Sequence, residues 1–154
     1  MNTVRKIASS VLALFVAILS FAKDGNSDVT KLIESGNYSI VVDKIFPSGA
    51  PMISSTDGYK LTMSDGKVNA QLPYFGEAHT SIVPGVDEPG ISFEDCEVSL
   101  KAVKGSGDWN WKFSAKSGNE NVDVVITIWK NGSAEIACTP ANRTFISYRG
   151  EVTE

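Results

Sequence analysis

The sequence predicts a mainly β protein: an antiparallel up-and-down β-barrel or strongly curved sheet, lipocalin-like, with about eight strands and one short N-terminal helix. Two observations lead to this fold class. From Tyr38 onward apolar and polar residues alternate with a period of two, and short turn sequences separate most of the alternating segments. Such a meander has two sheet edges that must be closed or covered, which favours a barrel. A sandwich of two sheets is the alternative.

The first 22 residues have the features of a secretory signal peptide. Arg5 and Lys6 precede an apolar run from Ile7 to Ala22 that ends in small residues. The run is shorter than the roughly 20 apolar residues of a spanning helix. We therefore expect cleavage near Ala22, a periplasmic or secreted protein with no membrane span after cleavage, and a single domain over residues 23–154.

The charge balance argues against nucleic acid as a partner. The chain carries 14 Lys and Arg against 18 Asp and Glu, and the predicted signal peptide removes two of the basic residues. Phosphate backbones and anionic lipid surfaces are bound by clusters of Lys and Arg, and this sequence has none. We expect binding to neither.

Residues 28–35 are predicted to form the short helix. Polar residues at positions 26–28 can cap its start, while Val29, Leu32 and Ile33 recur at helical spacing. Gly36 suits the left-handed residue that commonly ends a helix. Three apolar residues are enough to dock this helix on a sheet, and we expect it to need that support.

The turn at Asp65-Gly66 predicts the register of one hairpin. A two-residue loop pairs Met63 with Val68 and places the apolar residues of both strands on one face. A three-residue loop would mix the faces. The sequence therefore predicts a tight type I′ turn.

The turn at Asn131-Gly132 requires a different loop. A three-residue loop closed by Trp129 and Ser133 pairs Ile128 with Ala134 and gives one continuous apolar face. We expect Gly132 to adopt the left-handed conformation of a G1 bulge.

A further strand is predicted from Ile91 to Ala102. Its apolar phase slips by one residue at Glu94-Asp95, which is typical of a β-bulge. Before it lies a long connection, residues 74–90, rich in Gly and Pro. Connections of this length are often lids or binding loops.

Cys96 and Cys138 are predicted to be free, buried thiols. Export favours disulfides, yet both residues follow the apolar phase of their strands, and two strands separate them in a meander. Neighbouring strands lie about 4.8 Å apart, whereas a disulfide needs Cα atoms within about 7 Å.

Several segments together resemble the bacterial family called domain of unknown function 4251. The most specific segment is Leu72-Pro73-Tyr74-Phe75-Gly76 before the Gly-rich connection. The others are Tyr38 to Pro47, the hairpin through Asp65-Gly66, Gly90-Ile91-Ser92-Phe93, Trp109 and Ser147-Tyr148-Arg149-Gly150. The resemblance implies a secreted bacterial protein with a lipocalin-like β-barrel. It implies no activity, because none is assigned to the family, and no catalytic or binding residue carries over.

The residue types argue against an enzyme. His79 is the only histidine, and no Ser or Cys nucleophile motif accompanies it. Asp87-Glu88 and Asn119-Glu120-Asn121 could offer oxygen ligands to calcium, but they lack EF-hand spacing and are better interpreted as solvated loop acids. We expect no catalysis, no cofactor and no metal.

Aromatic residues suggest a ligand pocket. Rings near the open end of a small barrel can line an apolar cavity, with the loop that holds a histidine as its lid; the candidate residues are Tyr74, Phe75, His79, Trp109, Trp111 and Phe113. Alternatively, Trp111 and Phe113 fill the core. Two function classes follow: a carrier of a small apolar molecule or lipid, and a structural or interaction module that recognises another exported protein. The oligomeric state is not predicted.

Overall fold

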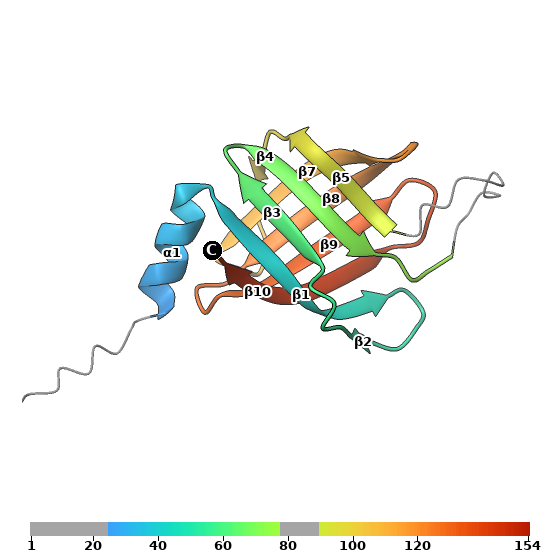
Figure 1. Ribbon diagram of the computed structural model, residues 1–154, viewed down its shortest axis with the longest axis horizontal. Helices are drawn as coiled ribbons and strands as arrows, with labels where there is room; N and C mark the ends of the chain where they lie inside the picture. Colours follow the sequence, from blue (N-terminus) through green and yellow to red (C-terminus); the bar gives the residue numbers. More distant parts are fainter. Residues whose placement is uncertain (1–24, 78–89) are drawn as a thin grey trace, which may run out of the picture.

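The computed structural model describes residues 25–77 and 90–154, which form one curled antiparallel sheet with a helix at one end (Figure 1). The elements are α1 (Gly25–Ser35), β1 (Tyr38–Pro47), β2 (Ile53–Ser54), β3 (Lys60–Ser64), β4 (Lys67–Pro73), β5 (Gly90–Glu97), β6 (Lys101–Ala102), β7 (Trp109–Ser117), β8 (Glu120–Ile128), β9 (Ser133–Pro140) and β10 (Ile146–Thr153). These described residues contain no helix long and apolar enough to cross a membrane.

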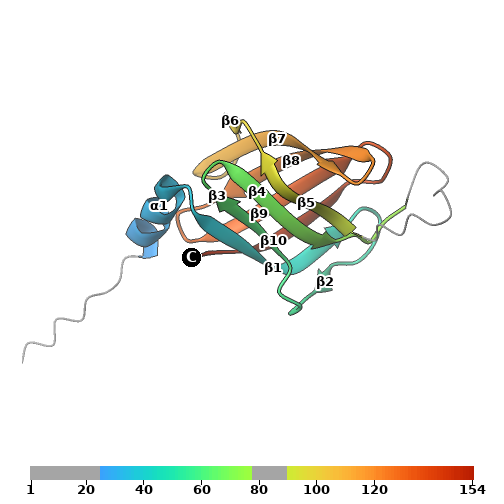
Figure 2. The same cartoon turned by 45° about the horizontal axis from the view of Figure 1, so that its top comes forward.

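The strands follow one another across the sheet in the order β5-β4-β3-β1-β10-β9-β8-β7-β6, and β2 pairs with β1. The β1–β10 ladder runs from Ser39 opposite Thr153 to Pro47 opposite Ile146. This ladder joins the front and back layers seen in Figure 2 into one continuous sheet. The predicted curved, barrel-like sheet is therefore confirmed, and the sandwich of two separate sheets is wrong.

A bulge in β1 contributes to the curl. The register against β10 shifts between Val42 and Lys44, next to the point where Val42 faces Gly150. A Cβ atom on Gly150 would lie 1.8 Å from the carbonyl oxygen of Val41, so the two backbones approach too closely for any side chain. Bulges of this kind bend a strand and increase its twist.

The register of the first predicted hairpin is confirmed. Met63 faces Val68 across the β3–β4 ladder, and the turn residues Asp65 and Gly66 have φ angles of 49° and 77°. Positive φ at both positions defines the type I′ turn.

The second hairpin also has the predicted register. Ile128 faces Ala134, the Trp129 amide donates to the Ser133 carbonyl at 3.0 Å, and Gly132 has a φ of 88°. The apolar faces of β8 and β9 thus coincide, as the alternation required.

The predicted strand from Ile91 to Ala102 is only partly correct. The bulge is present, because Ala70 faces Phe93 while Val68 faces Cys96, and Asp95 has a φ of 46°. However, β5 ends at Glu97, and β6 pairs with β7 at the opposite edge of the sheet. Residues 98–100 connect these two edges. The apolar alternation of the sequence continues through them because Val98 and Leu100 pack against the core.

The interior is filled by the inward-facing side chains of the long strands. The fully buried residues include Ile40, Leu61, Val68, Leu72, Ile91, Ile126, Ile136 and Tyr148. α1 begins three residues earlier than predicted and docks with Ile33 buried and Val29 and Leu32 half-buried. Gly36 ends the helix with a φ of 72°, as expected.

Both cysteines are free, as predicted, but only Cys138 has the predicted burial. Cys96 faces Val68 on β4, and Cys138 faces Ile146 on β10, so they lie on different parts of the sheet. Cys138 is fully buried, while Cys96 is partly exposed.

Candidate functional site

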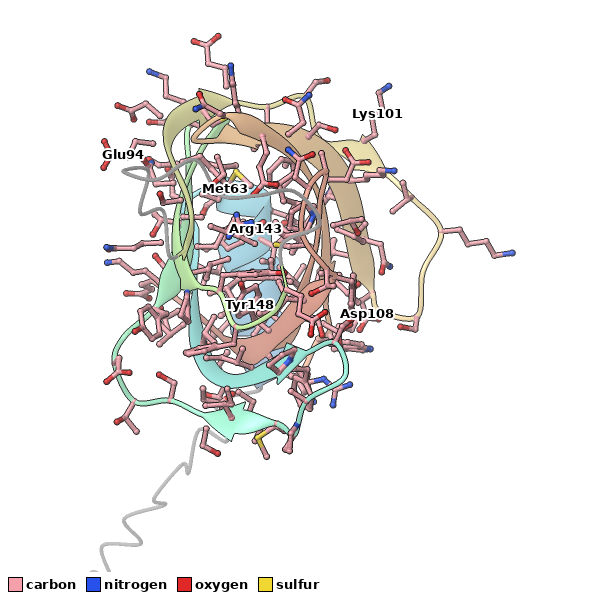
Figure 3. The ribbon with its side chains drawn as sticks, turned by 90° about the vertical axis from the view of Figure 1, so that its right-hand side faces the viewer. Met63, Glu94, Lys101, Asp108, Arg143 and Tyr148 are labelled. Carbon is pink, nitrogen blue, oxygen red and sulfur yellow. The ribbon has the colours of Figure 1, made fainter. Side chains whose placement is uncertain are left out.

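The strand directions bring four chain segments together at the end of the barrel opposite α1, which we call the loop end. β4 finishes there at Pro73, β5 starts at Gly90, and the β7–β8 turn and the β9–β10 connection lie beside them. Figure 3 looks into the barrel from this side and shows Arg143 and Tyr148 within the ring of strands.

An ion pair closes the loop end. Arg143 in the β9–β10 connection pairs with Glu120 at the start of β8, and only 13% and 11% of these side chains are exposed. Both terminal nitrogens of the guanidinium also donate to the Gly90 carbonyl at 3.3 Å. The second Glu120 oxygen accepts from the Asn142 amide at 3.1 Å. The pair thus has the additional hydrogen bonds that a buried charge pair needs.

This pair corrects the sequence-based interpretation of Glu120. We expected a solvated loop acid, whereas the structure buries the carboxylate under the β9–β10 connection. Arg143 lies 23 positions further along the chain. No local pattern indicates that these two turns meet. The only available signal was an arginine directly after a turn sequence, Thr139-Pro140-Ala141-Asn142.

Tyr74 links the loop end to the most specific segment of the family resemblance. Its ring lies under the guanidinium of Arg143, with 4.2 Å from the ring centroid to Cζ. Its hydroxyl lies 3.0 Å from the carbonyl and 2.9 Å from the hydroxyl of Thr144. The Thr144 amide donates to the Glu77 carbonyl at 3.0 Å. A Cβ atom on Gly76 would lie 2.5 Å from the Tyr74 hydroxyl, so this packing needs glycine.

Two exposed aromatic residues flank this network. Phe75 follows Tyr74 and Phe145 follows Thr144, and 44% of each residue is exposed. The hydrogen bonds between Tyr74 and Thr144 fix the backbone on which both rings stand. The loop end therefore presents two apolar rings next to hydrogen-bonded residues.

Buried groups beneath the network are held in their neutral forms. Tyr148 donates to the Pro73 carbonyl at 2.7 Å, and burial raises its pKa far above the usual value of 10.0. Burial raises the pKa of Cys138 to about 12, against an opposing effect of the nearby Arg143 charge. A thiol with so high a pKa is not a nucleophile near neutral pH.

β5 and β7 face each other with no backbone ladder between them. The Ser92 amide donates to the Ser117 hydroxyl at 3.0 Å, and the rings of Phe93 and Phe113 meet edge to face with centroids 6.2 Å apart. Ser117 is buried, although it is polar. Side chains thus close the seam of the barrel along the half nearest the loop end.

The structure does not gather the predicted pocket residues around one cavity. Tyr74 and Phe75 lie at the loop end, and Phe113 is buried in the core, as the core-filling alternative expected. Trp109 and Trp111 are half-buried towards the α1 end, where β7 begins. His79 lies outside the described residues. Among those residues, no three His, Cys, Asp or Glu side chains are grouped as a metal site requires.

Open hollows lie on the outer surface of the sheet. One, of about 540 Å³, lies over β3, β4 and β5, and polar side chains of all three strands are among its lining residues. Another, of about 450 Å³, lies beside the β1 bulge and is lined in part by Trp129 and Arg149.

A curled antiparallel sheet, filled by its own side chains and closed by a buried ion pair at one end, defines a small lipocalin-like barrel protein. The chain belongs to the family described as domain of unknown function DUF4251, whose model matches residues 22–152. It is similar in fold to the crystal structure of a DUF4251 family protein from Bacteroides eggerthii DSM 20697, with a TM-score of 0.59. The two share 15% sequence identity over 83% of this chain and 86% of the other. Curated proteins gave no match.

Proposed function

We propose that this chain is an exported, non-catalytic binding module that recognises another exported protein through its loop end. One observation carries the proposal: Phe75 and Phe145 are both 44% exposed on backbone that the Tyr74 and Thr144 hydrogen bonds hold in place. Aromatic side chains are among the residues that dominate the binding energy of protein–protein interfaces. A backbone that is already held in place loses little conformational entropy when the partner binds.

The filled interior favours a protein partner over a small ligand inside the barrel. Ile126, Ile136 and Tyr148 are fully buried, and Phe113 is committed to the ring contact with Phe93. A carrier of small apolar molecules needs a cavity of roughly 300–1,000 Å³ that encloses its ligand. The outer hollows are open to solvent and have a mixed polar and apolar lining, so neither encloses an apolar ligand.

Export and the absence of catalysis are parts of the same proposal. The signal-peptide pattern of residues 1–22 supports export. The charges of Arg143 and Glu120 neutralise each other, and the Cys138 thiol stays protonated, which supports a role without catalysis. Mass spectrometry of protein from the periplasm or medium of its host should find a mature N-terminus at Lys23. A chain retained in the cytoplasm with Met1 in place would contradict export.

The binding surface is tested with matched variants. Exported proteins are isolated from the host after cross-linking to a tagged form of the chain. Three forms are compared: the wild type, the Phe75→Ala/Phe145→Ala double variant and a Val41→Ala control. Val41 is also exposed, at 37%, but lies on β1 away from the loop end. The proposal requires a partner that, once purified, binds the wild type and the control equally and the double variant at least tenfold more weakly, a loss of about 1.4 kcal/mol. Equal binding by all three, or no partner enriched by the wild type, would reject it.

A small apolar ligand near α1 is the second candidate. Trp109 and Trp111 pack against the core yet remain half-buried, beside the similarly half-buried Leu100. Native mass spectrometry of protein purified from its host should then show a bound small molecule, which Trp111→Ala releases. If protein purified from its host without denaturation has the mass of the chain alone, this candidate is rejected.

A further inference from the structure

The hollow over β3, β4 and β5 has an ordered polar lining, and we call it the outer groove. It has a volume of about 540 Å³, and the segment Asp57-Gly58-Tyr59 forms one side of it. The register places the lining in two rows across the strands. One row is Lys60, Gln71 and Ser92. The other begins with Thr62 and Asn69, and Glu94 lies beyond them at the bulge of β5.

Much of the hydrogen-bonding capacity in this groove is unused. Within residues 25–77 and 90–154, the side chains of Lys60, Gln71, Ser92 and Glu94 have no hydrogen-bond or ion-pair partner. The Asn69 side-chain oxygen accepts from the Asp95 amide at 2.8 Å, which fixes the side chain and leaves its NH₂ group available. Figure 3 shows Glu94 pointing away from the barrel interior.

The outer face on the other side of the barrel is arranged differently. There Lys112 pairs with Asp123, which also accepts from Ser114, and Arg149 pairs with Glu135. Those side chains satisfy one another across neighbouring strands. A sheet face that is only exposed to solvent can therefore pair its polar side chains with one another. The polar side chains of the outer groove are not paired in this way.

We propose that the outer groove binds an uncharged saccharide. Hydroxyl and amide side chains both donate and accept hydrogen bonds, which matches the mixed capacity of sugar hydroxyls. Three strands about 4.8 Å apart, with side chains roughly 7 Å apart along each strand, give an area similar to one or two sugar rings.

The charges of the groove select against anionic sugars. Lys60 is the cation of the lining, and Asp57 and Glu94 are its two carboxylates, so the groove has an excess of one negative charge. A sulfated or uronic-acid saccharide would meet repulsion there. An uncharged ligand has no such cost.

Amide NMR of the 23–154 chain with maltotriose, cellotriose or diacetylchitobiose tests the proposal. At least one of these should shift the amide signals of Thr62, Asn69, Gln71 and Ser92, with a dissociation constant of about 1 mM or tighter. The Gln71→Ala/Ser92→Ala double variant should weaken this binding at least fivefold. Lys116→Ala, an exposed change on β7, is the matched control and should leave it unchanged.

Each remaining outcome overturns the proposal. No shifts with any of the three saccharides would show that the groove is an ordinary hydrated face. Shifts elsewhere on the barrel, or equal binding by the double variant, would place any sugar site outside the groove. Tighter binding of trigalacturonate than of maltotriose would contradict the charge argument. Because these variants leave Phe75 and Phe145 intact, the proposal can fail while the loop-end function stands.

Discussion

The two ends of the barrel are closed by different chemistry. The loop end has a buried ion pair, Arg143 with Glu120, and the directional hydrogen bonds of Tyr74. At the α1 end the helix packs with Ile33 buried and Val29 half-buried. The Asn37 side chain that follows the helix also accepts hydrogen bonds from the Ser64 hydroxyl at 3.1 Å and the Asp65 amide at 3.2 Å. Directional bonds fix one geometry, whereas apolar contacts tolerate repacking. The ion pair and hydrogen bonds of the loop end should therefore tolerate substitution less well than the apolar contacts of α1.

Removing the ion pair at the loop end should have the largest effect. Arg143→Ala leaves the mostly buried Glu120 side chain without its partner, and we expect a loss of about 3 kcal/mol in the free energy of unfolding, measured by urea denaturation. The backbone at Phe75 should also loosen, because the cation above the Tyr74 ring is lost.

The double variant Arg143→Met/Glu120→Leu separates stability from rigidity. Apolar replacement of a whole buried pair is often neutral for stability. We expect the double variant to recover most of the loss yet to keep faster amide exchange at Phe75 than the wild type. Full recovery of both quantities would show that the ion pair has no special role in positioning the loop end.

The buried thiol near this ion pair predicts a dependence on alkaline pH. The pKa of Cys138 rises from its ordinary 9.0 to about 12 because the folded protein buries the thiol. The folded state therefore holds this proton more tightly than the unfolded state. Its contribution to stability is complete below pH 9.0 and is lost as the pH rises towards about 12.

Denaturation of the wild type and of Cys138→Val at several alkaline pH values checks this prediction. The wild type should lose up to about 1.4 kcal/mol per pH unit more than the variant within that range. Burial also raises the pKa of Tyr38 to about 12 and the pKa of Tyr148, so both proteins should share a further decline above pH 10. Equal slopes would mean that the thiol is not desolvated.

The sequence alone predicts the features of the fold that depend on local geometry. Alternation of apolar residues and two positive-φ turns predict the registers around Asp65-Gly66 and Gly132, since a slip by one residue would reverse every side chain. The bulge at Glu94-Asp95 follows from the same rule. These features depend on neighbours within a few residues.

The features that were missed depend on distant segments. The Arg143–Glu120 pair joins two turns whose approach follows only from closure of the barrel. The end of β5 at Glu97 was hidden because Val98 and Leu100 keep the alternation while the chain crosses to the other edge. The aromatic candidates were grouped at one open end of the barrel, whereas the strand directions place Tyr74 and Phe75 at the loop end and Trp109 and Trp111 towards the α1 end.

The smallest predicted effect concerns a turn at the α1 end. Gly132 has a φ of 88°, and a Cβ atom added to it would lie 3.5 Å from a methyl group of Val29, which is an ordinary contact. Gly66, in the turn at Asp65-Gly66, has a φ of 77° and open space around it. Gly132→Ala and Gly66→Ala should therefore each cost about 1 kcal/mol of unfolding free energy, from backbone strain alone. A much larger loss at Gly132 would show that α1 is packed as rigidly as the loop end, and no loss at either position would contradict the positive-φ turns.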